Sequence, residues 1–194
     1  MPDDTSQPRL DDPERVFVIS GPSGVGKNTV LRGLEDRGSV TRAVTATTRP
    51  PREGEQDGED YFFVCPDTFE RWVREGRFLE HARYCGNRYG TPIFSVNRAL
   101  ESARAVVLEI EVQGAMQVQE SHPNVTLIFI APPSEQELRS RLTGRGDEAG
   151  ETLEKRMQRA REEMQYAEHY DHTVVNDSVE RAVDELETLI LSDA

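Results

Sequence analysis

The sequence has little cysteine, few aromatic residues, a deficit of positive charge and no long apolar run. Its two cysteines, Cys65 and Cys85, stand far apart without a ligand-like spacing, which argues against a structural disulfide or a zinc site. No apolar segment approaches the roughly 20 residues that a membrane-spanning helix needs. The formal net charge of −13 argues against general binding to nucleic acid or to an anionic membrane. We therefore expect a cytoplasmic protein that binds neither nucleic acid nor membrane, and the sequence leaves monomer and homo-oligomer open.

Short apolar runs alternate with helical patterns along the chain, which predicts an α/β fold. The run RVFVIS at 15–20 is rich in β-branched residues and ends at a glycine, as a buried strand does. The glycine-rich segment 21–27 follows, and Val30, Leu31 and Leu34 then recur with helical spacing. Further strands are expected at 105–112, 124–132 and 172–177, and further helices at 95–103, 133–146, 153–167 and 179–190.

The segment 44–94 has a different character and is expected to form an inserted lobe. It is rich in threonine, arginine, glycine, proline and tyrosine, and it holds short strand-like runs such as YFFV and RFLEHARY. A helical pattern at 66–76 places Phe69 and Trp72 on one face, where Trp72 is expected to pack in a core. The acidic, proline-bearing segment 1–14 has the features of neither a signal peptide nor a transit peptide, and we expect a mobile tail there.

The clearest motif is GPSGVGKN at 21–28, which matches the phosphate-loop pattern G-x-x-x-x-G-K-[S/T] except at its last position. Glycines let the backbone curl so that successive N–H groups and a helix N-terminus face a phosphate chain, while Lys27 reaches the β- and γ-phosphates. Asn28 stands where a hydroxyl usually ligates Mg²⁺, and its amide oxygen can ligate the ion or hold one of its waters. The alternative, a tight turn with an exposed lysine, is disfavoured by the flanking strand and helix. The motif predicts a nucleoside-triphosphate site formed by Gly21, Pro22, Ser23, Gly24, Val25, Gly26, Lys27, Asn28 and Thr29.

Two arginines, Arg49 and Arg52, flank a pair of prolines in the segment 45–55. Because prolines restrict the backbone, the two guanidinium groups are presented at low entropic cost and can chelate one phosphate. The alternative is a solvated basic loop on an acidic protein. Tyr61 and Tyr89 add phenolic donors, although a lone tyrosine is more often a half-buried packing residue.

Glu80 lies among apolar residues of a strand-like run, where a buried carboxylate without donors costs several kcal/mol. Guanine offers such a carboxylate two donors on one edge, N1–H and N2–H₂, while its O6 needs a hydroxyl or amide donor. Thr45 and Thr91 are the candidates for O6. These residues favour a guanine pocket in the lobe.

Six segments occur in the order seen in one enzyme family: GPSGVGK, TTRPPREGEQDGEDYFF, EHARYCGNRYGT, EIEVQGA, LTGRGDE and VVND. The chain thereby resembles the guanylate kinases from about Val16 to its C-terminus. The resemblance implies Mg²⁺-dependent transfer of a phosphoryl group from ATP to GMP, and to dGMP. It implies a P-loop NTPase-type parallel sheet flanked by helices, with a small GMP-binding lobe and a helical lid. The expected division is a tail at 1–14, a core at 15–43, 95–132 and 162–194, the lobe at 44–94 and the lid at 133–161.

The resemblance also assigns roles to single residues. It implies that the GMP phosphate is held by Arg49, Arg52, Tyr61 and Tyr89. It implies that the guanine and the rest of the acceptor are held by Glu80, Thr45, Thr91 and Glu55.

Glu109 and Glu111 stand where the family often carries aspartates. As residues two apart on an expected strand, they are expected to face the same side. One is expected to organise Mg²⁺ through water and the other to contact the nucleoside, and the roles are not divided between them. Asn28 and Glu109 are the candidates for the metal, and both glutamates belong to the expected GMP site.

The lid is implied by the same resemblance. Arg141 and Arg145 flank its glycine-rich tip and Arg156 follows, so closure brings cations to the transferring phosphoryl group and excludes water. Asn176 is expected near the adenine, with a structural turn as the alternative. The expected catalytic set is Lys27, Arg49, Arg141, Arg145 and Arg156.

Two other functions remain open at this point. The first is a binding module that has lost catalysis, which only Asn28 favours because the loop keeps Lys27 and its glycines. The second is a kinase of another phosphorylated acceptor, such as a ribose bisphosphate. Such a kinase shares the phosphate loop but does not need the guanine pocket of Glu80, Thr45 and Thr91.

Overall fold

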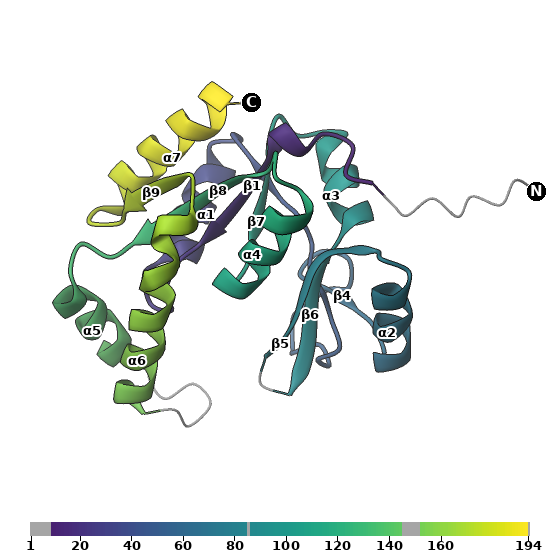
Figure 1. Cartoon of the computed structure of the whole chain (residues 1–194), viewed down its shortest axis with the longest axis horizontal. Helices are drawn as coiled ribbons and strands as arrows, with labels where there is room; N and C mark the ends of the chain where they lie inside the picture. The colour runs from purple at the N-terminus through teal and green to yellow at the C-terminus, as the bar shows by residue number, and fades with distance from the viewer. Residues whose placement is uncertain (1–8, 85, 145–151, 194) are drawn as a thin grey trace, which may run out of the picture.

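The computed structural model describes residues 9–84, 86–144 and 152–193, and it has a parallel core sheet from which a lobe and a lid extend (Figure 1). The strand order of the core sheet is β2-β7-β1-β8-β9, and all neighbouring strands are parallel. The strands are β1 Val16–Ser20, β2 Thr41–Arg42, β7 Val106–Glu109, β8 Thr126–Ala131 and β9 His172–Val175. Every residue of the central strand β1 is buried, because its side chains alternate between two apolar layers.

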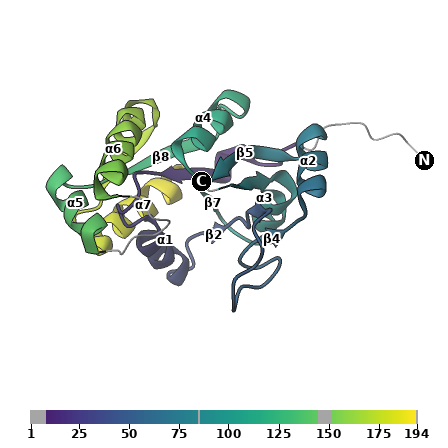
Figure 2. The same cartoon turned by 90° about the horizontal axis from the view of Figure 1, so that it is seen from below.

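Helices cover both faces of this sheet and complete the two layers. On one face lie α1 Lys27–Asp36 and α7 Val179–Asp193, and on the other lie α3 Ile93–Leu100 and α4 Val112–Ser121. Figure 2 shows α4 and α1 on opposite sides of the strands. The predicted α/β fold, a parallel sheet flanked by helices, is confirmed.

The lobe is a second sheet covered by one helix. Its strands, in the order β4-β3-β6-β5, are β3 Ala46–Thr47, β4 Phe62–Phe63, β5 Phe78–Tyr84 and β6 Asn87–Pro92. Helix α2 Pro66–Arg74 packs Phe69, which is fully buried, against the ring of Phe78 at a centroid distance of 4.5 Å. Trp72 contacts Phe78 and Phe94, in agreement with the packing role expected for it.

The region predicted to form the lid contains helices α5 Glu135–Gly144 and α6 Leu153–Met164, and the short 3₁₀ helix η3 Gln165–His169 follows. We keep the name lid for α5 and α6. A small apolar cluster holds its two helices together, formed by Leu138, Leu142, Met157 and Ala160. Figure 1 shows the lid and the lobe extending from the same edge of the core sheet, with α4 between them.

Residues 9–14 correct the expected end of the tail. Leu10 is 8% exposed and belongs to the apolar layer beneath α3, and the Asp11 N–H donates to Asn97 Oδ1 at 3.1 Å. A 3₁₀ helix, η1 Pro13–Arg15, then leads into β1. The boundary predicted at residue 14 is therefore too late, because a single apolar side chain anchors a segment whose composition is otherwise polar.

Strand β7 and helix α4 correct the prediction for residues 105–121. The strand was expected to continue to 112, but it ends at Glu109, and α4 begins at Val112. The helix was not predicted, because Gly114 lowers the helix propensity of its first turn and its sequence follows directly on a buried strand. Among the described helices, none has the length and apolar character to cross a membrane.

Candidate active site

The phosphate loop connects β1 to α1, and its glycines are required by close backbone packing. A Cβ at Gly21 would lie 2.3 Å from the carbonyl oxygen of Ile130, and a Cβ at Gly26 would lie 2.7 Å from Asn176 Nδ2. Gly26 also has a φ of 98°, which side-chain-bearing residues rarely adopt, and it caps the N-terminus of α1. Lys27 is the first residue of that helix, and its Nζ donates to the Gly21 carbonyl. The loop therefore has the curled backbone that can receive a phosphate chain.

A large pocket of about 510 Å³ runs from this loop to the lobe. The loop and the end of β7 form one side, while Ala82 and Arg83 of β5 and residues of α6 form the others. Of the predicted site residues it is lined by Pro22, Ser23, Gly24, Gly26, Lys27, Asn28, Glu109 and Glu111. The predicted phosphate-loop residues and the lobe strand thus share one cavity.

Glu163 is a residue of this pocket that sequence reasoning missed. It lies near the end of α6, is 7% exposed, and its Oε2 accepts from the Ser23 N–H at 3.3 Å. Burial and the nearby Glu111 raise the pKa of its carboxyl, while Lys27 acts in the opposite direction. The local sequence carries no signal for this contact, because the two partners come from α6 and the distant phosphate loop.

Glu109 and Glu111 both line the pocket, but they do not share a strand. Glu109 is the last residue of β7, whereas the exposed Glu111 is the N-terminal cap of α4. Their expected placement on one face of a strand is therefore wrong, because the strand ends between them. Burial raises the pKa of Glu109, and the positive charges of Lys27 and Arg42 act in the opposite direction.

The two oxygens predicted for Mg²⁺ are engaged by an arginine. Arg42 Nη1 donates to Asn28 Oδ1 at 3.2 Å and to Glu109 Oε2 at 3.1 Å. The described residues hold no group of three or more His, Cys, Asp or Glu side chains suited to a metal ion. Asn28 and Glu109 as they are arranged here therefore do not fit a direct metal-ligand pair.

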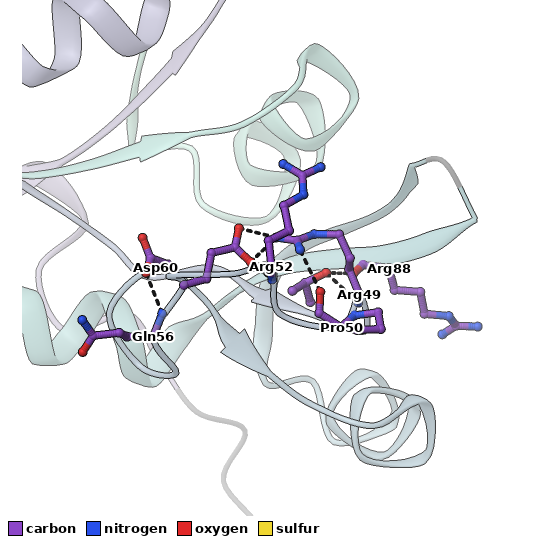
Figure 3. Close-up of polar contacts among 8 residues, drawn as sticks. Arg49, Pro50, Arg52, Gln56, Asp60 and Arg88 are labelled. Carbon is purple, nitrogen blue, oxygen red and sulfur yellow. Dashed lines mark hydrogen bonds and ion pairs between the residues drawn. The ribbon is translucent and has the colours of Figure 1, made fainter. Parts of the chain in front are cut away.

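Arg49 and Glu55 form the centre of the predicted phosphate site in the lobe. Arg49 Nη2 donates to both carboxylate oxygens of Glu55, at 2.7 and 2.9 Å, and the Arg52 N–H donates to Glu55 Oε2 at 2.6 Å. Figure 3 shows the Arg49 side chain lying close to the turn, while the Arg52 guanidinium extends away from the turn. The same carboxylate thus holds the Arg49 guanidinium and the Arg52 backbone, while the Arg52 guanidinium is not bound to it.

Tyr61 and Tyr89 lie beside this fork, as predicted. The Arg49 guanidinium carbon lies 5.4 Å from the centroid of the Tyr61 ring, and the rings of Tyr61 and Tyr89 meet edge to face at 6.2 Å. Burial raises the pKa of Tyr61, and the positive charge of Arg49 acts in the opposite direction. Arg49 and the two tyrosine rings therefore form one cluster in the lobe.

Glu80 is the buried carboxylate of the lobe. It is 6% exposed, and the Thr91 hydroxyl donates to its Oε1 at 2.8 Å. Burial raises the pKa of Glu80 to about 7, and the Thr91 hydrogen bond acts in the opposite direction. Because a hydroxyl has a single proton to donate, Thr91 orients Glu80 here and does not stand open to O6. Thr45 is half-buried next to β3.

Gly114 of α4, which packs against Glu80, is another residue that sequence reasoning missed. A Cβ at this position would lie 2.8 Å from Glu80 Oε2. The carboxylate therefore packs directly on the helix backbone, where only glycine leaves enough room.

A second pocket of about 370 Å³ lies on the other side of the phosphate loop, and Thr29, Arg141 and Asn176 are among its lining residues. Asn176 is 2% exposed, and its Nδ2 donates to the Val25 carbonyl at 2.7 Å. Its Oδ1 is buried and has no partner among the described residues. A buried acceptor of this kind is costly unless a ligand supplies a donor.

The lid arginines take different places. Arg141 donates to the backbone carbonyls of Val25 and Asn176, each at 3.1 Å, so it joins α5 to the phosphate loop. Arg156 Nη1 donates to the Leu142 carbonyl at 3.2 Å. The predicted residue Arg145 lies outside the described residues.

The chain matches known proteins over most of its length. The family model described as "Guanylate kinase" matches residues 13–193. The guanylate kinase of Latilactobacillus sakei is 49% identical over 180 residues, covering 92% of this chain and 89% of that protein. The guanylate kinase of Gloeobacter violaceus is 48% identical, covering 92% of this chain and 88% of that protein. The crystal structure of guanylate kinase from Anaplasma phagocytophilum superimposes with a TM-score of 0.70 at 31% identity, covering 95% of this chain and 88% of that one.

Proposed function

The chain belongs to the guanylate kinase family of nucleoside-monophosphate kinases, and on that premise we propose how its cleft transfers a phosphoryl group from ATP to GMP and dGMP. The observation that carries the proposal is the pocket that the phosphate loop shares with strand β5 of the lobe. The predicted acceptor residues Glu80, on β5, and Tyr89, on the paired strand β6, belong to the same lobe sheet. An anion at the phosphate loop and an anion held by the lobe would thus be brought within reach of each other, which converts a bimolecular reaction into a positioned one.

On the donor side, the loop N–H groups and Lys27 hold the ATP phosphates. The adenine occupies the second pocket, where the buried Asn176 Oδ1 accepts from its exocyclic amine. The orientation of this amide is set by its Nδ2, which is committed to the Val25 carbonyl. Arg141 fixes the loop from the lid side.

On the acceptor side, Arg49, Arg52, Tyr61 and Tyr89 hold the GMP phosphate, and Glu80 accepts from guanine N1–H and N2–H₂. Glu55 positions Arg49 by its two-oxygen contact and yields to the incoming phosphate, which is the stronger bidentate partner of the fork. Thr91 positions Glu80, which leaves Thr45 as the hydroxyl for O6.

The chemistry requires charge stabilisation more than proton transfer. The attacking GMP phosphate oxygen is already largely ionised at neutral pH, so no side chain has to act as a general base. Mg²⁺, when bound with ATP, would supply positive charge that offsets the negative charge of the phosphates. Lys27 supplies a fixed cation at the β- and γ-phosphates, and closure of the lid adds Arg145 and Arg156 and excludes water. We also propose a cytoplasmic location, which suits the exposed free thiol of Cys65.

A panel of phosphoryl acceptors tests this function. With ATP and Mg²⁺, coupled ADP release is expected to be fast with GMP and dGMP, and at least about a hundredfold slower with AMP and ribose bisphosphate. Lys27→Ala is expected to lower kcat by about a hundredfold or more, with an unchanged thermal midpoint. Turnover of ribose bisphosphate in preference to GMP contradicts the guanine pocket, and binding of GMP without any ADP release indicates a binding module.

A further inference from the structure

Arg42 lies beside the phosphate loop and was not among the predicted site residues, although it contacts two of them, Asn28 and Glu109. It ends β2, the edge strand of the core sheet, and its side chain is 28% exposed. Its guanidinium donates to Glu35 through Nε at 3.1 Å and through Nη2 at 2.6 Å. The remaining nitrogen, Nη1, is the donor that Asn28 and Glu109 share. All three guanidinium nitrogens are therefore committed to oxygens of three different side chains.

The secondary structure explains why these groups converge. Asn28 and Glu35 lie about two turns apart on α1, so they share one helix face. Strand β2 pairs in parallel with β7, with Arg42 opposite Val107, which brings Arg42 close to the end of β7. The side chain thereby spans from the sheet edge to the helix. A planar guanidinium with donors in a fixed fork suits this set of contacts, which the ammonium group of lysine cannot reproduce.

We propose that Arg42 is a positioning residue that replaces a metal contact at the phosphate loop: it holds the oxygens of Asn28 and Glu109, so that Asn28 presents its amide N–H₂ group to the nucleotide. Because arginine has no acceptor, the Asn28 atom that faces it is Oδ1, and Nδ2 is the amide atom that remains for other partners. Asn28 lines the large pocket, where a donor suits phosphate oxygens. The proposal rests on the function proposed for this cleft.

The positive charge of Arg42 predicts the direction in which metal affinity changes when the residue is replaced, whereas a packing role does not. A fixed positive charge near a metal site repels a divalent cation and attracts phosphate oxygens. Loss of Arg42 removes this repulsion and frees two oxygens that a metal can use. Metal binding to the nucleotide complex is therefore expected to tighten, whereas loss of a merely structural contact leaves it unchanged or weakens it.

Mn²⁺ is the probe for this prediction, because electron paramagnetic resonance reports its free concentration. Each protein is saturated with ADP and titrated with Mn²⁺. Arg42→Met is expected to bind Mn²⁺ at least about threefold more tightly than the natural protein. Asn28→Ala is expected to bind it within about threefold of the natural protein, because its oxygen is not a metal ligand.

Arg37→Met is the matched control. Arg37 also pairs with two carboxylates, Asp184 and Glu187, but these lie on α7 and do not line the phosphate pocket. This variant loses the same charge and is expected to keep its Mn²⁺ affinity within about threefold. A smaller tightening by Arg42→Met, or a loss greater than about threefold by Asn28→Ala, overturns the proposal.

Calorimetric titration with ADP separates this inference from the proposed function. A natural protein that does not bind ADP contradicts the nucleotide site itself. Normal ADP binding, with Mn²⁺ affinities outside the limits above, contradicts only the role of Arg42. If circular dichroism shows that Arg42→Met does not fold, the Mn²⁺ affinity of Asn28→Ala tests the proposal with the same limit of about threefold. The Asn28 side chain is exposed, so its truncation is tolerated by the fold.

Discussion

At the scale of single residues, we propose that Glu80 selects the acceptor. Its carboxyl is buried, and its pKa is raised to about 7, so near neutral pH it is divided between the protonated and the ionised form. Guanine presents two donors to it, and only the ionised carboxylate accepts from both. Binding of GMP therefore favours loss of the proton from Glu80.

The KM for GMP is accordingly expected to fall as pH rises from about 6 to about 8. With a pKa near 7, the ionised fraction of Glu80 grows about tenfold over this range, and the KM for GMP falls by a similar factor. The KM for ATP is expected to change by less than about twofold. Steady-state kinetics with each substrate varied in turn measures both constants.

The GMP phosphate also titrates, with a pKa of about 6, so a control is needed. Glu80→Gln keeps the shape of the side chain and removes its titration. This variant is expected to bind GMP weakly throughout the range, and to show only the shallow slope of the phosphate. A flat profile for the natural protein, or the full slope in Glu80→Gln, is inconsistent with the role of Glu80.

At the scale of elements, helix α4 packs against Glu80, the residue proposed to bind guanine. Gly114 lets the Glu80 carboxylate lie against the helix backbone, because a Cβ there would come within 2.8 Å of Oε2. The glycine lowers the stability of the helix, since glycine is about 1 kcal/mol less favourable than alanine in a helix interior. The position of Glu80 thus depends on a weak point of α4.

Gly114→Ala is expected to raise the KM for GMP by about tenfold and to leave the KM for ATP within about twofold. The added methyl group displaces the carboxylate of Glu80, while the gain in helix propensity keeps the protein folded. Glu120→Ala, at an exposed position of the same helix, is the control and should change neither constant. An unaltered KM for GMP in Gly114→Ala argues that Glu80 does not contact guanine.

The elements also show what the sequence could and could not predict. The phosphate loop was predictable because its residues are consecutive and its strand and helix carry clear periodicities. Helix α4 was not, because its apolar positions are separated by Gly114 and polar residues and follow directly on a buried strand. Arg42 and Glu163 were missed for a different reason: their partners belong to elements distant in the sequence, and no local pattern encodes such contacts.

At the scale of the whole molecule, three parts surround one cavity. The core supplies the phosphate loop and the start of α4, the lobe supplies Ala82 and Arg83 of β5, and the lid supplies residues of α6. Arg49, Tyr61 and Tyr89 cluster in the lobe and are not among the residues that line this cavity. We propose that this cluster forms the acceptor end, and the phosphate loop the donor end, of one cleft.

The most direct test of this arrangement is the binding of a dinucleotide in which adenosine and guanosine are joined by five phosphates. Calorimetry and competition assays are expected to find one molecule bound per chain, displacing both ATP and GMP. Lys27→Ala and Arg49→Lys should each weaken binding by about tenfold or more, because they act on opposite ends of one ligand. Arg77→Lys, on the exposed surface of the lobe, should not. Displacement of only one substrate, or independent binding of two dinucleotide molecules, would contradict a single cleft.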